Sequence, residues 1–234
     1  MRPNHVDIRE IFTIESNTID LNSEEYDFHN KEIEINFPLV LKSLTNSTII
    51  CSRIIILSSN VNIYGLNIKG SIVLRNVDNV TIQNTTMSDS DTGTGGSIVI
   101  THGNDIKLQN IFISNISTPG IFVESESTIQ ISNCSLQDIN TSMIYLSDKV
   151  DAYIENCILC KSNSNAIYFT KNSSVEIHNT EIHHVKMPAI FSISSSLTCT
   201  DSFIHDTNSA ICLTNCYNSN VLKNTFNDID SSCI

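Results

Sequence analysis

The sequence predicts an all-β protein, a single-stranded parallel β-helix in which about nine coils of about 23 residues stack as a solenoid. Three observations support this. A short motif recurs along the chain at a nearly fixed interval. Each recurrence is accompanied by short apolar alternations typical of strands. Ile is more abundant than Leu, which suits a pleated sheet because β-branched side chains pack well there. Hydrophobic residues make up 40% of the chain, enough for a continuous core.

The recurring motif places two mostly apolar residues, two apart, before an Asn or Asp, as in Val80-Thr-Ile-Gln-Asn84. Its last residues are Asn84, Asn110, Asn133, Asn156, Asn179, Asp201 and Asn224. After a first interval of 26 residues, the spacing is 22 or 23 residues. Stacked strands lie about 4.8 Å apart. We therefore expect these residues to form an asparagine ladder at an interior turn, in which each amide bonds to the next coil.

Two further apolar segments recur in every unit. One begins three residues after the Asn or Asp, and its positions are Met87, Ile113, Leu136, Leu159, Ile182 and Ile204. The other is an alternating strand such as Ile144-Tyr-Leu146, whose first and third residues should face inward. Each coil should therefore contain three short strands. No coil can bury its apolar side alone, so neighbouring coils must stabilise one another.

The ends of the chain are less regular. We expect residues 1–17 to form an N-terminal cap and residues 18–234 to form the β-helix, regular from residue 60 onward. Residues 18–21, 31–35, 38–41 and 47–50 are strand-like, and Gly65 occupies the ladder position in the first regular coil. The cap should cover strand edges that would otherwise be free to pair. The last coil is incomplete at Ile234, so we expect the β-helix to continue, or to be capped, beyond it.

Composition narrows the function classes. A net charge of −12 opposes binding to nucleic acid or to an anionic membrane. The N-terminus has no apolar signal segment, and no apolar run approaches the length of a membrane span. We therefore expect a cytoplasmic chain with eight reduced cysteines and no cofactor. A leucine-rich repeat is the structural alternative, but its Leu-x-Leu-x-x-Asn spacing does not fit the Ile-x-Ile-x-Asn found here.

The coil from Ile129 to Leu146 resembles the right-handed parallel β-helix proteins of the pectin-lyase-like type, and in particular the NosD-like and F-box-associated carbohydrate-binding and sugar hydrolase repeats. The resemblance covers about residues 18–234. It implies right-handed coils, in agreement with the rule for parallel crossovers. It implies no single function, because such coils occur in lyases, hydrolases, epimerases, adaptors and scaffolds.

The resemblance also implies catalytic motifs against which the chain can be compared. Pectin hydrolases of this fold carry paired Asp residues, a Gly-His-Gly and an Arg-x-Lys motif. The nearest segment here, Thr101-His-Gly-Asn-Asp105, lacks the first Gly and the Asp pair. The known catalytic sets therefore do not map onto this chain, and a non-enzymatic role is favoured.

The middle residues of the alternating strands should face outward. They include Val99, Phe122, Tyr145, Tyr168 and Phe191, and the four aromatic residues are each 23 apart. We expect an aromatic stripe on one outer face, defined as Phe122, Tyr145, Tyr168 and Phe191. Cross-strand stacking alone would explain it. An exposed apolar patch also marks docking sites for another protein, a second copy, a flanking domain or a sugar. We therefore predict a non-catalytic protein-interaction or scaffold domain of a larger intracellular protein.

The alternative function is a carbohydrate-active enzyme or a carbohydrate-binding β-helix. Carboxylates near the aromatic stripe would then supply the acids, and the candidates are Glu124, Glu126 and Asp148. Glu124 and Glu126 are two residues apart and could share a face.

Three other features have a simple structural interpretation with a functional alternative. Cys160, His183 and His205 should stack one coil apart, near enough to share a soft metal, although we predict solvated side chains and no metal. Cys134 and Cys157 should lie one coil apart as a reduced pair. The longest coil contains the Asp89–Gly96 insertion, a solvated turn whose Asp89 and Asp91 could chelate Ca²⁺.

Overall fold

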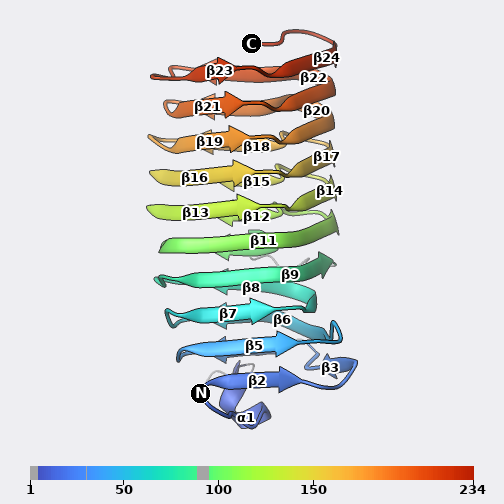
Figure 1. Cartoon of the computed structure of the whole chain (residues 1–234), viewed down its shortest axis with the longest axis vertical. Helices are drawn as coiled ribbons and strands as arrows, with labels where there is room; N and C mark the ends of the chain where they lie inside the picture. The colour runs from blue at the N-terminus through green and yellow to red at the C-terminus, as the bar shows by residue number, and fades with distance from the viewer. Residues whose placement is uncertain (1–4, 30, 89–94) are drawn as a thin grey trace.

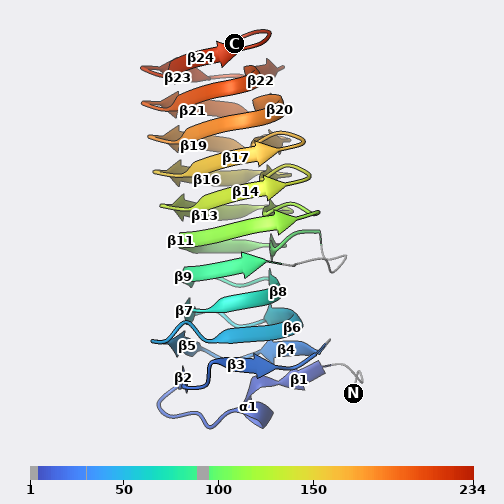
Figure 2. The same ribbon diagram turned by 90° about the vertical axis from the view of Figure 1, so that its right-hand side faces the viewer.

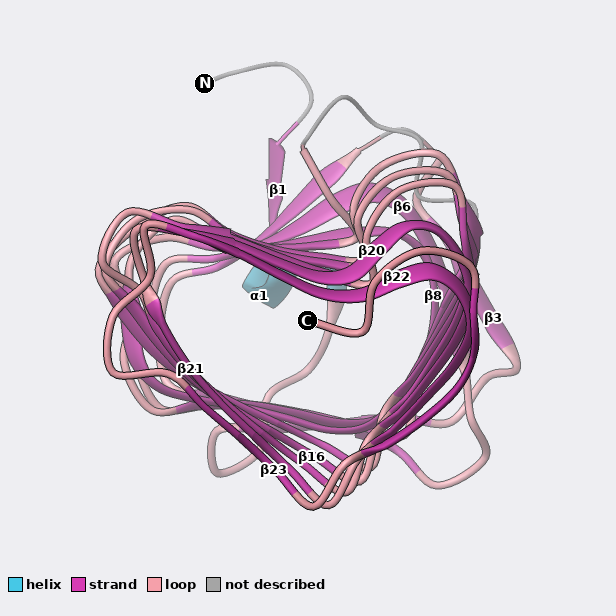
Figure 3. Ribbon diagram, turned by 90° about the horizontal axis from the view of Figure 1, so that it is seen from above, coloured by secondary structure: helices cyan, strands magenta, loops and turns pink. Residues whose placement is uncertain are grey.

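The computed structural model describes residues 5–29, 31–88 and 95–234. It confirms the predicted fold, a parallel β-solenoid whose strands stack coil upon coil along one axis (Figure 1). Viewed along that axis, the coils superpose as three sides (Figure 3). The predicted insertion residues Asp89 and Asp91 lie outside the described residues.

The three sides are here called the first, second and third faces, in the order in which each regular coil visits them. The first face contains β2 (Thr18–Leu21), β5 (Leu39–Ser43), β7 (Val61–Tyr64), the starts of β9 (Val80–Ser88) and β11 (Gly103–Ile116), β13 (Ser127–Ser132), β16 (Val150–Glu155), β19 (Ser174–His178), β21 (Ser196–Thr200) and β23 (Asn220–Leu222). Each pairs in parallel with the strand one coil away.

The second face is turned toward the viewer in Figure 2, and its strands also pair in parallel with those one coil away. It contains β3 (Glu25–Asp27), the starts of β6 (Thr48–Ile56) and β8 (Asn67–Leu74), the ends of β9 and β11, β14 (Ser135–Ile139), β17 (Ile158–Ser162), the starts of β20 (Glu181–Ile193) and β22 (Phe203–Thr214), and β24 (Thr225–Ile229).

The third face contains the outward aromatic positions. It consists of β1 (His5–Asp7), β4 (Glu32–Ile35), the ends of β6 and β8, β10 (Ile98–Ile100), β12 (Ile121–Val123), β15 (Ile144–Leu146), β18 (Ile167–Thr170) and the ends of β20 and β22. Long strands such as β20 run from the second face to the third, with a register shift between Val185 and Pro188 at the bend.

The N-terminal segment forms β1 and a single-turn helix, α1 (Ile8–Ile11), which lies at the N-terminal end of the solenoid (Figure 1). The Asp7 carboxylate caps the helix by accepting a hydrogen bond from the Arg9 backbone N–H, and Ile8 is buried in the core. The sequence did not predict β3, because Glu25–Asp27 contains one apolar residue, too few to produce a periodic signal. No helix among the described residues has the length and apolar character needed to cross a membrane.

The core follows the predicted alternation. In β15, Ile144 and Leu146 are fully buried while Tyr145 between them is partly exposed. The positions three residues after the motif's Asn or Asp are also buried, namely Met87, Ile113, Leu136, Leu159, Ile182 and Ile204. Burying an Ile or Leu side chain stabilises the fold by about 1.5–3 kcal/mol relative to leaving it exposed. The stacked coils therefore share one continuous apolar interior.

The motif's Asn and Asp residues form a column at the turn between the first and second faces, but their interior placement was wrong. Six of the seven are exposed, and these six have left-handed backbones with φ between 45° and 54°. The side chain after each of them, such as Cys134 or Cys157, points inward instead. Side-chain hydrogen bonds link two pairs of neighbours: Asn110 donates to Asn84 (3.0 Å) and Asn179 to Asn156 (2.7 Å). A continuous amide ladder is not confirmed.

The backbone conformation explains the residue choice at this turn. Asn and Asp tolerate the left-handed region better than other residues with a side chain. Gly65 takes the same position with φ of 69°, and a Cβ there would lie 2.3 Å from the Ser43 carbonyl oxygen. In the last coil Lys223 is left-handed instead, and the partly buried Asn224 accepts a hydrogen bond from the Ser202 N–H.

Replacing Asn133 tests this explanation, because its side chain makes no hydrogen bond within the described part of the chain and its φ is 54°. We expect Asn133→Ala to lower the free energy of unfolding by about 1–2 kcal/mol, since Ala is disfavoured in the left-handed region. Asn133→Gly should stay close to the unsubstituted chain. Urea unfolding monitored by circular dichroism measures both, and equal losses for Ala and Gly would contradict the explanation.

A core substitution tests the shared interior. Ile154 in β16 is fully buried between neighbouring coils. We expect Ile154→Ala to cost about 2–5 kcal/mol of unfolding free energy through lost burial and a residual cavity. The outward Gln130→Ala, one coil away on the same face, is the control and should change stability by less than about 0.5 kcal/mol. Similar losses in both variants would be inconsistent with the inward and outward assignment.

Candidate functional site

The aromatic stripe lies on the third face as one stacked column. The register pairs Phe122 with Tyr145, Tyr145 with Tyr168, and Tyr168 with Phe191. Their ring centroids are 5.2, 4.9 and 5.5 Å apart, and the interplanar angle falls from 36° to 12° along the column. All four side chains are partly exposed. The rings therefore stack on one another and are also accessible from outside.

This stacking determines which part of each ring a ligand can reach. The faces of Tyr145 and Tyr168 are covered by the neighbouring rings on both sides. Their edges remain accessible, and neither Tyr hydroxyl makes a hydrogen bond within residues 5–29, 31–88 and 95–234. Burial, with a smaller contribution from Tyr145, raises the pKa of Tyr168, so this hydroxyl stays protonated at neutral pH and can donate.

A groove runs beside the stripe at the bend between the second and third faces. Tyr145, Tyr168 and Phe191 form one wall, and the loops at 140–142 and 164–165 form the other together with Met187. None of the described residues that line it is charged. Met187 is 51% exposed and enlarges the apolar surface next to the rings.

The N-terminal end of the stripe is closed. Val99, one of the predicted partner-binding residues, is only 4% exposed and so cannot present a contact surface. Next to it, Gly95 and Gly96 lie against the ring and Cβ of Phe122, where a Cβ on Gly96 would come within 3.0 Å of the Pro119 carbonyl oxygen. The accessible part of the stripe therefore runs from Phe122 toward Phe191.

The three candidate acids lie at the turn that leaves the third face. Glu124 and Glu126 are exposed, and Asp148 is partly exposed. The Glu126 carboxylate pairs with Lys149 at 2.9 Å, and this hydrogen bond lowers its pKa. A general acid needs the opposite shift to hold its proton at neutral pH. Glu126 is therefore poorly suited to that role.

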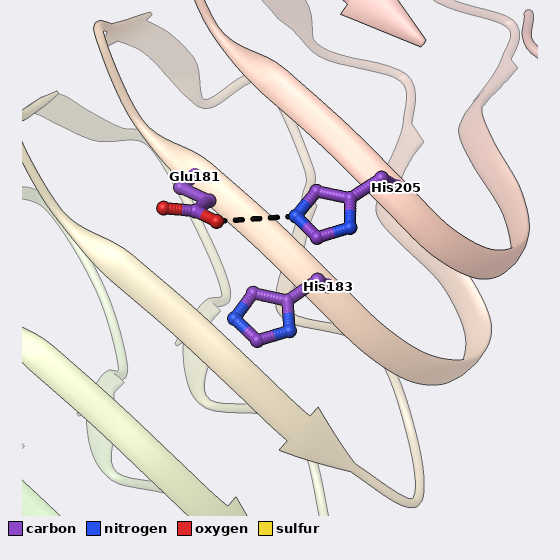
Figure 4. A group of neighbouring side chains, drawn as sticks. All are labelled: Glu181, His183 and His205. Atoms are coloured by element: carbon purple, nitrogen blue, oxygen red, sulfur yellow. Dashed lines mark hydrogen bonds and ion pairs between the residues drawn. The ribbon is translucent and has the colours of Figure 1, made fainter. Parts of the chain in front are cut away.

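The predicted column Cys160, His183 and His205 is present by register. Among the described residues, the group whose ligand atoms could share a metal ion consists of the two histidines and Glu181, without Cys160. The His183 and His205 rings are parallel, with centroids 4.8 Å apart. Glu181 joins them, and its Oε1 lies 3.1 Å from His205 Nε2 (Figure 4). Cys160 is outside this group and 6% exposed, and burial raises its thiol pKa. Strand alternation could have identified Glu181, because it lies two residues before His183 on the same side of β20.

The pKa values of the two histidines are shifted in opposite directions. Burial lowers the pKa of His183, and the nearby His205 and His184 lower it further. Burial also opposes charging of His205, but hydrogen bonds to Asp206 and Glu181 outweigh it and raise the pKa of His205. The hydrogen bond with His205 in turn lowers the pKa of Asp206.

The predicted cysteine pair lies in the interior as free thiols. Cys134 and Cys157 are both buried on adjacent coils. Each thiol points to the backbone carbonyl two residues before it, with Cys134 Sγ 3.3 Å from the Ser132 oxygen and Cys157 Sγ 3.2 Å from the Glu155 oxygen. The neighbouring thiol of Cys134, together with burial, raises the pKa of Cys157, which therefore acts as a small core residue.

Comparisons with known proteins concern the fold. No curated protein matches the chain. Two solved structures are similar: the catalytic domain of a GH87 α-1,3-glucanase in complex with nigerose (8% identity, TM-score 0.35) and the Streptococcus pneumoniae surface protein and adhesin PfbA (10% identity, TM-score 0.34). The match covers 93% of this chain and 63% of the glucanase chain, so this chain spans less than two thirds of its length. For the adhesin it covers 91% of each chain.

The family comparison covers most of the chain. Residues 43–152 and 142–234 match the family described as the right handed beta helix region. These segments contain the regular coils, with their three parallel faces and their buried apolar alternation. The chain belongs to the right-handed β-helix family.

Proposed function

We propose that this chain is a non-catalytic protein-interaction domain, a rigid β-helix scaffold that binds a protein partner through the aromatic stripe and the groove beside it. The observation that carries the proposal is the stack of four partly exposed rings next to an uncharged groove. The described residues that line the groove carry no charge, in a chain whose net charge is −12.

The chemistry of the strip suits a protein partner. Tyr side chains offer a large apolar area, a polar tip and few rotatable bonds, and they are common among residues that dominate binding energy. Here Tyr145 and Tyr168 are held in place by their neighbours, so little conformational entropy is lost on binding. Their hydroxyls lack partners among the described residues and can bond to a partner's backbone.

The same geometry weakens the carbohydrate alternative. A sugar ring packs its C–H face on an aromatic face, but the faces of Tyr145 and Tyr168 are covered by adjacent rings. The polar wall of the groove, with Thr141 and Ser142, is the feature that favours a sugar. We therefore keep carbohydrate binding as the second candidate. Among the predicted acids, the ion-paired Glu126 gives no support to an enzyme.

Tyr168→Ser tests the docking role. A photo-crosslinking residue in place of Tyr145 identifies the partner, and calorimetry with that purified partner measures the affinity. We expect Tyr168→Ser to weaken binding at least about 30-fold, as for a central interface residue worth about 2 kcal/mol. A second copy of the chain counts as a partner, and sedimentation over a concentration series measures its affinity.

Two matched variants control for loss of fold. Tyr153→Ser removes an aromatic residue that is 37% exposed on the first face, and it should leave the affinity unchanged. Tyr168→Phe keeps the stack and loses only the hydroxyl, and we expect an intermediate loss. If Tyr168→Ser binds as tightly as Tyr153→Ser, the stripe is not the interface.

A polysaccharide screen tests the second candidate. We expect neutral and acidic polysaccharides neither to retard the chain in affinity electrophoresis nor to release reducing ends. Glu124→Gln, which removes an exposed carboxylate beside the stripe, should behave identically. Release of sugar that is abolished in Glu124→Gln would establish an enzyme and overturn the interaction-domain proposal.

A further inference from the structure

Two imidazoles and a carboxylate converge on the second face, away from the aromatic stripe. Glu181 and His183 project from the same side of β20, and His205 is the register partner of His183 on β22. One ligand atom from each of the three lies within 4.8 Å of the other two. Figure 4 shows the two rings lying one above the other beside the carboxylate. The parallel register of two adjacent coils therefore brings these donors together.

The neighbours of both histidines leave the same ring nitrogen available. Asp206 Oδ2 accepts a hydrogen bond from His205 Nδ1 at 2.7 Å, so that His205 Nε2 faces Glu181. His183 Nδ1 and His184 Nδ1 are 2.6 Å apart and share a hydrogen bond, and in the tautomer in which His183 Nδ1 donates it, the lone pair of His183 Nε2 is available to a metal. A carboxylate on the far nitrogen of a ligating histidine is a regular feature of zinc sites, where it fixes the orientation of the ring.

The structure assigns a new metal site: we propose that Glu181, His183 and His205 bind one Zn²⁺ ion that joins β20 to β22, with Asp206 as a positioning residue for His205. Two imidazoles and one carboxylate are a donor set that zinc uses with a solvent molecule as fourth ligand. Ca²⁺ and Mg²⁺ prefer sets made entirely of oxygen. The buried thiol of Cys160 lies outside the group, so the donors found among the described residues are nitrogen and oxygen atoms.

The dimensions need only a small local adjustment. Tetrahedral bonds of about 2.0–2.2 Å place ligand atoms roughly 3.3 Å apart. The Glu181 Oε1 to His205 Nε2 distance of 3.1 Å already fits, and the ion takes the place of the proton between these atoms. The remaining separations are at most 4.8 Å. The Glu181 side chain is 42% exposed and can move closer, and it leaves the fourth position open to solvent.

Binding should stabilise the stacked coils. The donors come from two coils and meet only when β20 and β22 are in register, so the unfolded chain lacks the assembled site. An ion that binds only the folded state raises its stability in proportion to the logarithm of ion concentration over Kd. The site is independent of the aromatic stripe, so its test does not depend on the docking role.

The experiment uses the whole chain, freed of metal with a chelator and titrated with Zn²⁺ under reducing conditions. We expect one equivalent to bind by calorimetry and the unfolding temperature to rise with Zn²⁺ concentration. His205→Gln and Glu181→Gln should each weaken binding at least tenfold and abolish that rise. Asp206→Asn should weaken binding about 10–100-fold, as for other second-layer partners of ligating histidines.

The matched control is His178→Gln. His178 is a partly buried histidine on the first face of the same coil as Glu181 and His183, hydrogen-bonded to Thr200 and outside the group. This variant should bind like the unsubstituted chain. Zinc X-ray absorption should show nitrogen and oxygen neighbours with imidazole scattering and no sulfur.

Three results would overturn the assignment. The first is a sulfur neighbour of zinc in the absorption spectrum, which would place the ion on the cysteines. The second is an equal zinc affinity for the unsubstituted chain and Glu181→Gln. The third is that the unsubstituted chain binds no zinc. Because Glu181 is substantially exposed, Glu181→Gln should fold normally, and circular dichroism of the metal-free variants checks this.

Discussion

The left-handed backbone at the turn between the first and second faces is the constraint on which the rest of this structure depends. At each regular coil, one residue with positive φ redirects the chain from one face to the next without a long loop. Because the turn has the same shape each time, neighbouring strands stay in parallel register, even where the interval between turns lengthens to the 26 residues from Asn84 to Asn110. Asn and Asp meet the conformational requirement, and Gly65 meets it where the Ser43 carbonyl leaves no room for a side chain.

A fixed register turns a sequence repeat into columns of side chains. Inside, the columns are apolar and together form one core, so each coil is stabilised by its neighbours rather than by itself. Outside, a column can concentrate one chemistry along the axis. Four residues 23 apart give the aromatic stripe on the third face, and two residues 22 apart give the stacked His183 and His205 on the second. Both candidate sites are products of the same stacking rule.

The two outer columns differ in what surrounds them, and this sets their chemistry. The aromatic rings cover one another's faces and stand beside an uncharged groove, which leaves edges and hydroxyls for a partner. The histidines are flanked by Glu181 and Asp206, whose hydrogen bonds orient the His205 ring and raise its pKa. A rigid solenoid can therefore present two independent surfaces on adjacent faces without a loop devoted to either.

The sequence by itself determined the period, the three strands per coil, the inward and outward alternation, and the membership of each column. Strand geometry repeats every two residues, and the coils after Asn110 repeat every 22 or 23. Tertiary structure decided the rest. The motif's asparagines point outward because positive φ reverses the side chain, which a pattern of residue types cannot reveal. Val99 is buried although it occupies an outward position. Strand alternation shows on which side of the strand a side chain lies, but not whether other parts of the chain cover that side. Glu181 meets His205 diagonally across two strands, a contact that depends on side-chain direction and on strand register together.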